Sequence, residues 1–180
     1  MILIDANLLI YAVDADSPHH RQARRWLEEM LSGTTRVGLP WIVLLAFLRI
    51  TTREGILVRT LTPEAAIAYV DAWLAQPNVE LVAPGPNAWP VFRGLMLASG
   101  TAGNLTSDAH LAAMAIERGA TVCSTDNDFR RFPGLRHANP IAGSSRSLHG
   151  HRADTGGGPY DAGQAVFFSR AAARSSEMPV

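Results

Sequence analysis

The chain has 180 residues, a formal net charge of zero and a single cysteine, Cys123. This length allows one domain with a substantial core, and the balanced charge gives no global field that would indicate a nucleic-acid partner. One cysteine excludes a disulfide within the chain, and we expect Cys123 to be a buried structural thiol. Carboxylates interrupt the first apolar run, and the apolar run at residues 41–48 is too short to cross a bilayer. We therefore expect a soluble, cytoplasmic protein with no membrane partner.

The first half of the chain predicts alternating strands and helices. Its opening residues are nearly all apolar, which is typical of a parallel strand that is covered on both faces. Gly33 ends one expected helix, Pro40 opens an apolar one, and Thr62 precedes a helix with Pro63 at its first position. The expected strands cover residues 1–4, 35–39 and 78–83, and the expected helices cover residues 8–13, 19–31, 41–52 and 63–76.

The most informative stretch of the chain runs from Asn104 to Phe129. Within it, Thr106 and Ser107 are expected to cap a helix that ends at Gly119. An apolar strand follows this helix and leads into two acidic residues. The remaining elements are expected at residues 87–97 (helix), 120–125 (strand) and 136–140 (short strand).

Three acidic residues are placed so that a parallel sheet would bring them to one edge. Asp5 follows the first strand, Asp126 follows the strand at residues 120–125, and Asp108 lies in the first turn of the helix before that strand. A helix that feeds a parallel strand starts at the edge where the strands end. Each acid alone is also typical of a turn or a helix start. Together, however, they would repel one another unless a cation neutralised them, and Mg²⁺ prefers oxygen ligands. The pattern therefore predicts a metal site.

The amino-acid composition of the chain changes after residue 141. Residues 142–180 are rich in Gly, Ser and His, show no hydrophobic periodicity and contain three consecutive glycines. We expect one α/β domain over residues 1–141 and a disordered or loosely packed tail over residues 142–180.

Residues 1–141 resemble PIN-domain ribonucleases of the VapC toxin type, from bacterial type II toxin-antitoxin pairs. The resemblance rests on the segments MILIDANLLIYAV and GNLTSDAHLAAMAIERGATVCSTDNDFRRFPGL and on the apolar helix with Arg49 between them. It implies a Rossmann-like three-layer sandwich with a central, mostly parallel sheet. It also implies RNA cleavage that depends on Mg²⁺ or Mn²⁺, a homodimer, and inhibition by a cognate antitoxin.

One position departs from the family pattern. The family usually adds a glutamate within the apolar helix after the second strand, but no acid occurs from Met30 to Arg53, and Ala46 stands near the expected place. The remaining acids can hold one cation with its waters, which argues against a firmly held second one. By position, the family's metal-binding acids are matched by Asp5, Asp108 and Asp126, and the second acid of its TDxDF turn is matched by Asp128.

These residues receive distinct expected roles in phosphodiester hydrolysis, because a divalent ion activates water and neutralises charge on the phosphate. Asp5 and Asp108 are expected to bind the ion directly or through water, and Asp126, with Asp128, is expected to orient the attacking water. The expected supporting residues are Asn7 and Thr125 around the ligands, and Arg49, Arg130 and Arg131 as candidates to bind RNA phosphates.

Two other interpretations stay open at this point. A domain without the helix glutamate can be a catalytically inactive module that binds RNA or a protein partner. A phosphatase with an aspartate nucleophile shares the opening pattern, but such enzymes need a second Asp where this chain has Asn7, and a lysine, which the chain lacks. The apolar helices at residues 41–48 and 65–74 are consistent with a dimer contact or with a buried core.

Overall fold

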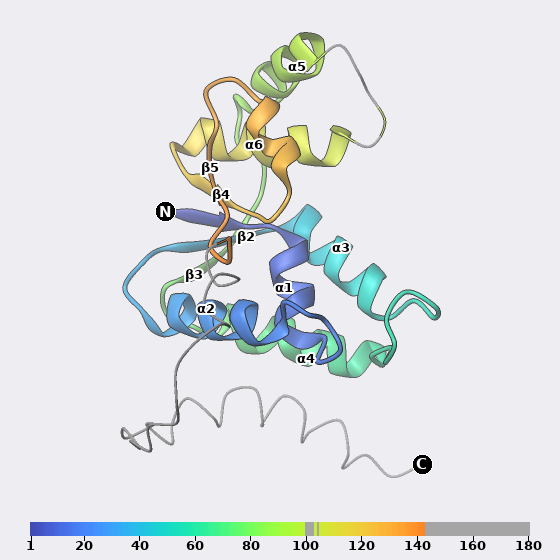
Figure 1. Ribbon diagram of the computed structural model, residues 1–180. Coiled ribbons are helices and arrows are strands. Elements are labelled where there is room, and N and C mark those ends of the chain that lie inside the picture. Colours follow the sequence, from blue (N-terminus) through green and yellow to red (C-terminus); the bar gives the residue numbers. More distant parts are fainter. Residues whose placement is uncertain (100–102, 104, 143–180) are drawn as a thin grey trace, which may run out of the picture.

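The computed structural model describes residues 1–99, 103 and 105–142, so the predicted tail lies outside the described residues except for Ala142. The described part is a parallel α/β domain (Figure 1). Its strands are β1 (Ile2–Ile4), β2 (Val37–Pro40), β3 (Val79–Val82), β4 (Thr121–Cys123) and β5 (Arg136–Ala138). Its helices are α1 (Ala6–Val13), α2 (His20–Ser32), α3 (Trp41–Thr51), α4 (Pro63–Leu74), α5 (Ala88–Ser99), α6 (Leu105–Arg118) and the short 3₁₀ helix η1 (Asn127–Arg131).

The five strands form one parallel sheet in the order β3-β2-β1-β4-β5. The N-terminal strand β1 is therefore central, and it pairs with β2 on one side and β4 on the other. Leu3 and Ile4 are fully buried, as expected for a strand covered on both faces. In the β1–β4 register, Ile4 pairs with Cys123, which places the next residues, Asp5 and Ser124, at the same edge of the sheet.

Helices cover both faces of the sheet, which gives the predicted three-layer sandwich. The α5–α6 pair lies on one side, and α1, α2 and α4 lie on the other (Figure 1). Phe47 of α3 and Trp73 of α4 are fully buried, and their rings meet edge to face with centroids 4.9 Å apart. These contacts hold α3 against the core. None of the described helices is long and apolar enough to cross a membrane.

The predicted strands and helices are confirmed, with differences at their ends. The prediction that Thr106 and Ser107 cap α6 is wrong, because the helix begins at the buried Leu105 and both residues lie within its first turn. The strand β4 covers Thr121–Cys123 and is shorter than the predicted strand at residues 120–125. Gly119 ends α6 with a φ of +57°, as expected for a glycine after a helix.

Candidate functional site

Asp5 occupies the point where β1 ends and α1 begins. Its Oδ1 accepts a hydrogen bond from the backbone N–H of Ala6 at 2.7 Å, so the carboxylate caps α1. Its Oδ2 accepts a second hydrogen bond from the Ser124 hydroxyl at 2.7 Å. Burial raises the pKa of Asp5, and these two hydrogen bonds oppose that shift. The carboxylate is thus fixed in position by two different segments of the chain.

Ser124 is the residue that joins these segments, and the sequence did not single it out. It is fully buried directly after β4. Its hydroxyl donates to Asp5 and accepts hydrogen bonds from Asn7 Nδ2 at 2.9 Å and from the backbone N–H of Asp126 at 3.0 Å. Its carbonyl accepts a hydrogen bond from His137 Nε2 at 3.0 Å. One serine therefore orients Asp5, Asn7 and the start of the turn that carries Asp126.

The turn after β4 places Asp126 and Asp128 at the same edge. Asp126 caps η1, where its Oδ1 accepts a hydrogen bond from the backbone N–H of Asp128 at 2.8 Å. Asp128 in turn forms an exposed ion pair with Arg131, in which Oδ1 of Asp128 lies 3.4 Å from Nη1 of Arg131. Both acids thus have structural partners in addition to their predicted roles.

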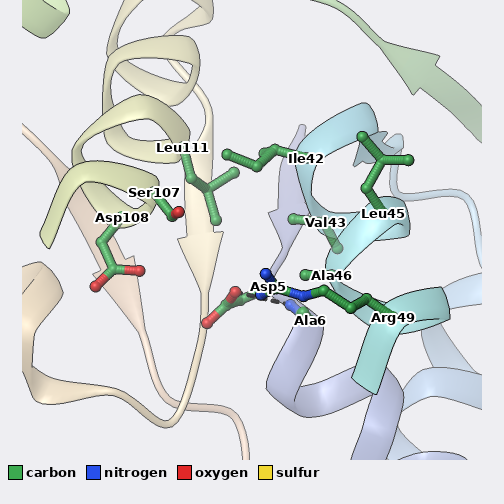
Figure 2. Close-up of a pocket in the computed structure, with 10 residues that line it drawn as sticks. All are labelled: Asp5, Ala6, Ile42, Val43, Leu45, Ala46, Arg49, Ser107, Asp108 and Leu111. Atoms are coloured by element: carbon green, nitrogen blue, oxygen red, sulfur yellow. Dashed lines mark hydrogen bonds between the residues drawn. The ribbon is translucent and has the colours of Figure 1, made fainter. Parts of the chain in front are cut away.

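A cavity of about 230 Å³ opens between α3, α6 and the end of β1 (Figure 2). Asp5 and Asp108 both line it, so the structure brings together these two predicted ligands from opposite ends of the domain. Asp126, Asp128, Asn7 and Thr125 do not line it. Its lining consists of Asp5, Ala6, Ile42, Val43, Leu45, Ala46, Arg49, Ser107, Asp108 and Leu111.

The acids at this edge act on one another electrostatically. The pKa of Asp108 is raised to about 6, first by burial and then by the negative charges of Asp5, Asp126 and Asp128. Ionised Asp108 is therefore unfavourable unless positive charge is close. The order of the acids along the chain predicts this repulsion at the edge of the sheet.

The donor atoms fit a hydrated hard cation. Asp5 and Asp108 offer carboxylate oxygens to the cavity, and Mg²⁺ prefers such ligands and keeps several of its waters. Within residues 1–99, 103 and 105–142, no three His, Cys, Asp or Glu side chains are close enough to form a metal site by themselves. A cation bound here would therefore take much of its coordination from water.

The predicted arginines fall into two groups. Arg49 lines the cavity, on the α3 face that also carries Ala46. Arg130 and Arg131 are exposed on η1 outside the cavity. Ala46 lies in the cavity lining, so α3 contributes a methyl group rather than a carboxylate at this position.

A sequence profile of the PIN domain matches residues 2–135, which is most of the chain. The chain belongs to the PIN domain family. Among relatives of this PIN domain, Ribonuclease VapC37 of Mycobacterium tuberculosis is 46% identical over 142 residues, covering 79% of this chain and 99% of the relative. Ribonuclease VapC33 of the same species is 45% identical over 141 residues, covering 78% of this chain and 99% of the relative. The predicted resemblance to VapC-type PIN domains is thus confirmed.

Solved structures show the same fold for this PIN domain. VapC20 of Mycobacterium tuberculosis, described as a sarcin-ricin loop cleaving toxin, matches with a TM-score of 0.57 at 17% identity, covering 76% of this chain and 99% of that one. VapBC2 of Rickettsia felis, bound to a promoter DNA fragment, also matches with a TM-score of 0.57 at 21% identity, covering 77% of this chain and 98% of that one. At these identities the likeness concerns the fold, and it confirms the predicted fold class.

Proposed function

We propose that this PIN domain is a Mg²⁺-dependent endoribonuclease, the toxin of a type II toxin-antitoxin module, with Mn²⁺ as an alternative ion. The observation that carries this proposal is the cavity at the edge of the parallel sheet, which both Asp5 and Asp108 line. The ribonuclease names of its relatives, at up to 46% identity, support RNA as the substrate.

The acidic residues have separate tasks in this proposal. Asp5 and Asp108 hold the ion directly or through its waters, and Asp126 contributes as a third ligand through water. When bound, the ion lowers the pKa of a coordinated water and offsets negative charge on the phosphate. Ser124 keeps the Asp5 carboxylate in one orientation through its 2.7 Å hydrogen bond, and Asn7 supports Ser124 from the α1 side. Thr125, next to Ser124, is proposed to support the same ligands.

Hydrolysis requires a water that is aligned with the scissile phosphorus. The water oxygen forms a bond to phosphorus while the bond to the leaving ribose oxygen breaks, and the leaving oxygen takes up a proton. Asp126, with Asp128, is proposed to orient this water and to accept the proton that it loses. Arg130 and Arg131, exposed beside these acids, are positioned to meet flanking RNA phosphates.

The proposed partners are a cognate antitoxin, which blocks the site, and a second copy of the chain, both in the cytoplasm. The match to VapBC2 of Rickettsia felis supports the antitoxin. Three exposed apolar side chains support a subunit contact over α3 and α4. They are Trp41, Leu45 and Ile67, with exposed fractions of 52%, 58% and 49%.

The test is to compare RNA 5′ and 3′ ends by sequencing after induction of the wild type and of Asp5→Asn. We expect specific new ends with the wild type and none with the variant. Asp71→Asn is the matched control, because Asp71 is an exposed acid on α4 away from the cavity, and its pattern should equal that of the wild type.

A second measurement separates the nuclease from the alternative, an inactive binding module. Mg²⁺ or Mn²⁺ should raise the melting temperature of the purified wild type and of Asp71→Asn, but not that of Asp5→Asn. RNA cleavage that continues in excess EDTA would contradict metal dependence. If the protein bound RNA but did not cleave it at any ion concentration, the result would favour the inactive binding module. In that module, Ala46 stands where the family usually has a glutamate.

A further inference from the structure

The face of α3 that meets the acids carries one charged residue, and that residue is basic. Ile42, Leu45, Ala46 and Arg49 are spaced at i, i+3, i+4 and i+7, so they lie on one side of the helix, and all four line the cavity. Arg49 is the one cationic side chain among the residues of this lining. The helix therefore presents positive charge and apolar surface to the carboxylates.

Arg49 has donors to spare for a ligand. Within the described part of the chain, no hydrogen bond or ion pair joins its guanidinium to another residue, whereas Arg131 at the same edge is paired with Asp128. Figure 2 shows the Arg49 side chain extending from α3 into the cavity on the side where Asp5 lies. A guanidinium offers five N–H donors in a planar fork that suits two oxygens of one phosphate.

The charge of the lining also leaves a place for an anion. Ionised Asp5 and Asp108 together with Arg49 carry a formal charge of −1. One divalent cation would bring this lining to +1, which suits a phosphodiester with its single negative charge. On the α3 side, Ala46 and Arg49 offer no oxygen ligand to a second divalent cation.

We propose that Arg49 is a further catalytic residue, which binds the non-bridging oxygens of the scissile RNA phosphate and replaces a second metal ion in balancing their charge. This inference rests on the proposed function. As water attacks, negative charge builds up on those oxygens, and a guanidinium beside them stabilises that charge more than it stabilises the ground state. The site then works with one divalent ion per chain.

The first test compares the rates of metal-dependent RNA cleavage of the full-length wild type, Arg49→Ala and Arg49→Lys. We expect Arg49→Ala to lower kcat by about 10²–10³-fold, as for the loss of a transition-state donor, and Arg49→Lys to recover part of the loss. Arg53→Ala is the matched control, since Arg53 is exposed just beyond the end of α3 and does not line the cavity. Its kcat should stay close to that of the wild type.

Two measurements without turnover complete the test. Calorimetric titration with Mn²⁺ should give one bound ion per chain for the wild type and for Arg49→Ala. In excess EDTA, the anisotropy of a fluorescein-labelled single-stranded RNA should report weaker binding by Arg49→Ala, with a log-log salt slope smaller by about 0.7. Urea unfolding should show that Arg49→Ala is as stable as Arg53→Ala.

The outcomes distinguish this inference from the proposed function. If the wild type cleaves RNA and Asp5→Asn does not, but Arg49→Ala cleaves as fast as Arg53→Ala, the role of Arg49 is wrong and the nuclease stands. Two bound ions per wild-type chain would also overturn the inference. A wild type that cleaves no RNA with either ion would overturn both proposals.

Discussion

The two sides of the cavity are built by different means. On the sheet-edge side, Asp5, Ser124 and Asp126 are connected by hydrogen bonds of 2.7 and 3.0 Å from one segment to the next. On the α3 side, Arg49 has no such bond to another described residue, and the helix is held by the packing of Phe47 against Trp73. The first side fixes the orientation of acidic side chains, while the second fixes the position of a whole helix.

Because the two sides are built differently, we expect them to respond to different substitutions. The sheet-edge side is sensitive to the loss of single polar atoms, because buried polar groups without partners cost free energy. The α3 side is sensitive to lost volume beneath the helix and tolerant of changes on its exposed face. The free energy of unfolding, measured with urea, tests both statements on one scale.

The largest effect is expected below α3. Phe47→Ala should lower the free energy of unfolding by about 3–5 kcal/mol, because it leaves a cavity beside Trp73. Arg53→Ala, at an exposed residue just beyond the end of α3, should change it by no more than about 0.5 kcal/mol. Similar losses for both variants would mean that core packing does not hold α3 in place.

A smaller effect is expected at Ser124. Ser124→Ala removes a partner from both Asp5 Oδ2 and Asn7 Nδ2, and should cost about 1–3 kcal/mol in urea unfolding. The control is Thr106→Ala, which changes an exposed hydroxyl residue in the first turn of α6 that does not line the cavity. The variant should also bind Mn²⁺ more weakly than the control, since Asp5 loses its fixed orientation. Equal stability and equal Mn²⁺ affinity would show that the hydrogen-bonded side is not sensitive to single polar atoms.

The electrostatic contribution of Asp108 should make the free energy of unfolding of the metal-free protein depend on pH. Its pKa in the fold is about 6, above the ordinary value of 3.8, so between these values the folded state binds more protons than the unfolded state. In EDTA, stability should therefore fall as pH rises from about 4 to about 6, and this contribution should be constant at higher pH. Asp108→Asn should show a smaller decline than the wild type. A steeper decline of stability in the variant would contradict the conclusion that the fold raises the pKa of Asp108.

The smallest effect is expected at the exposed rim of the sheet-edge side. Arg131→Ala breaks the 3.4 Å ion pair with Asp128, in which both side chains are about half exposed, and should cost less than about 1 kcal/mol. The loss should shrink further in high salt. A loss as large as that of Ser124→Ala would place this pair within the hydrogen-bonded network.

The sequence predicted the positions of the acids because their placement follows from topology. Asp5 comes directly after β1 and Asp126 three residues after the end of β4, and a parallel sheet must bring such strand ends to one edge. Asp108 lies at the start of the helix that returns to β4, so it reaches the same edge. These three positions needed only strand and helix periodicity, which is strong in this chain.

Ser124 and the α3 lining could not be identified in the same way. Ser124 and Thr125 are equally polar neighbours, and only the pairing of Ile4 with Cys123 shows that Ser124 is the one beside Asp5. Strand register depends on contacts between distant segments, which local patterns do not contain. Likewise, Ile42 and Leu111 look in the sequence like any other apolar helix residues. Only the structure shows that they line a cavity between α3 and α6.

The central position of β1 has a consequence for the timing of assembly. The first strand of the domain, β1, pairs with β4, whose residues 121–123 are translated near the end of the domain. Until then, Asp5 has neither Ser124 beside it nor Asp108 opposite it, because both arrive with the last part of the domain. The two proposed ligands therefore come together only after β4 has been made, so the proposed metal site forms late in the synthesis of the domain.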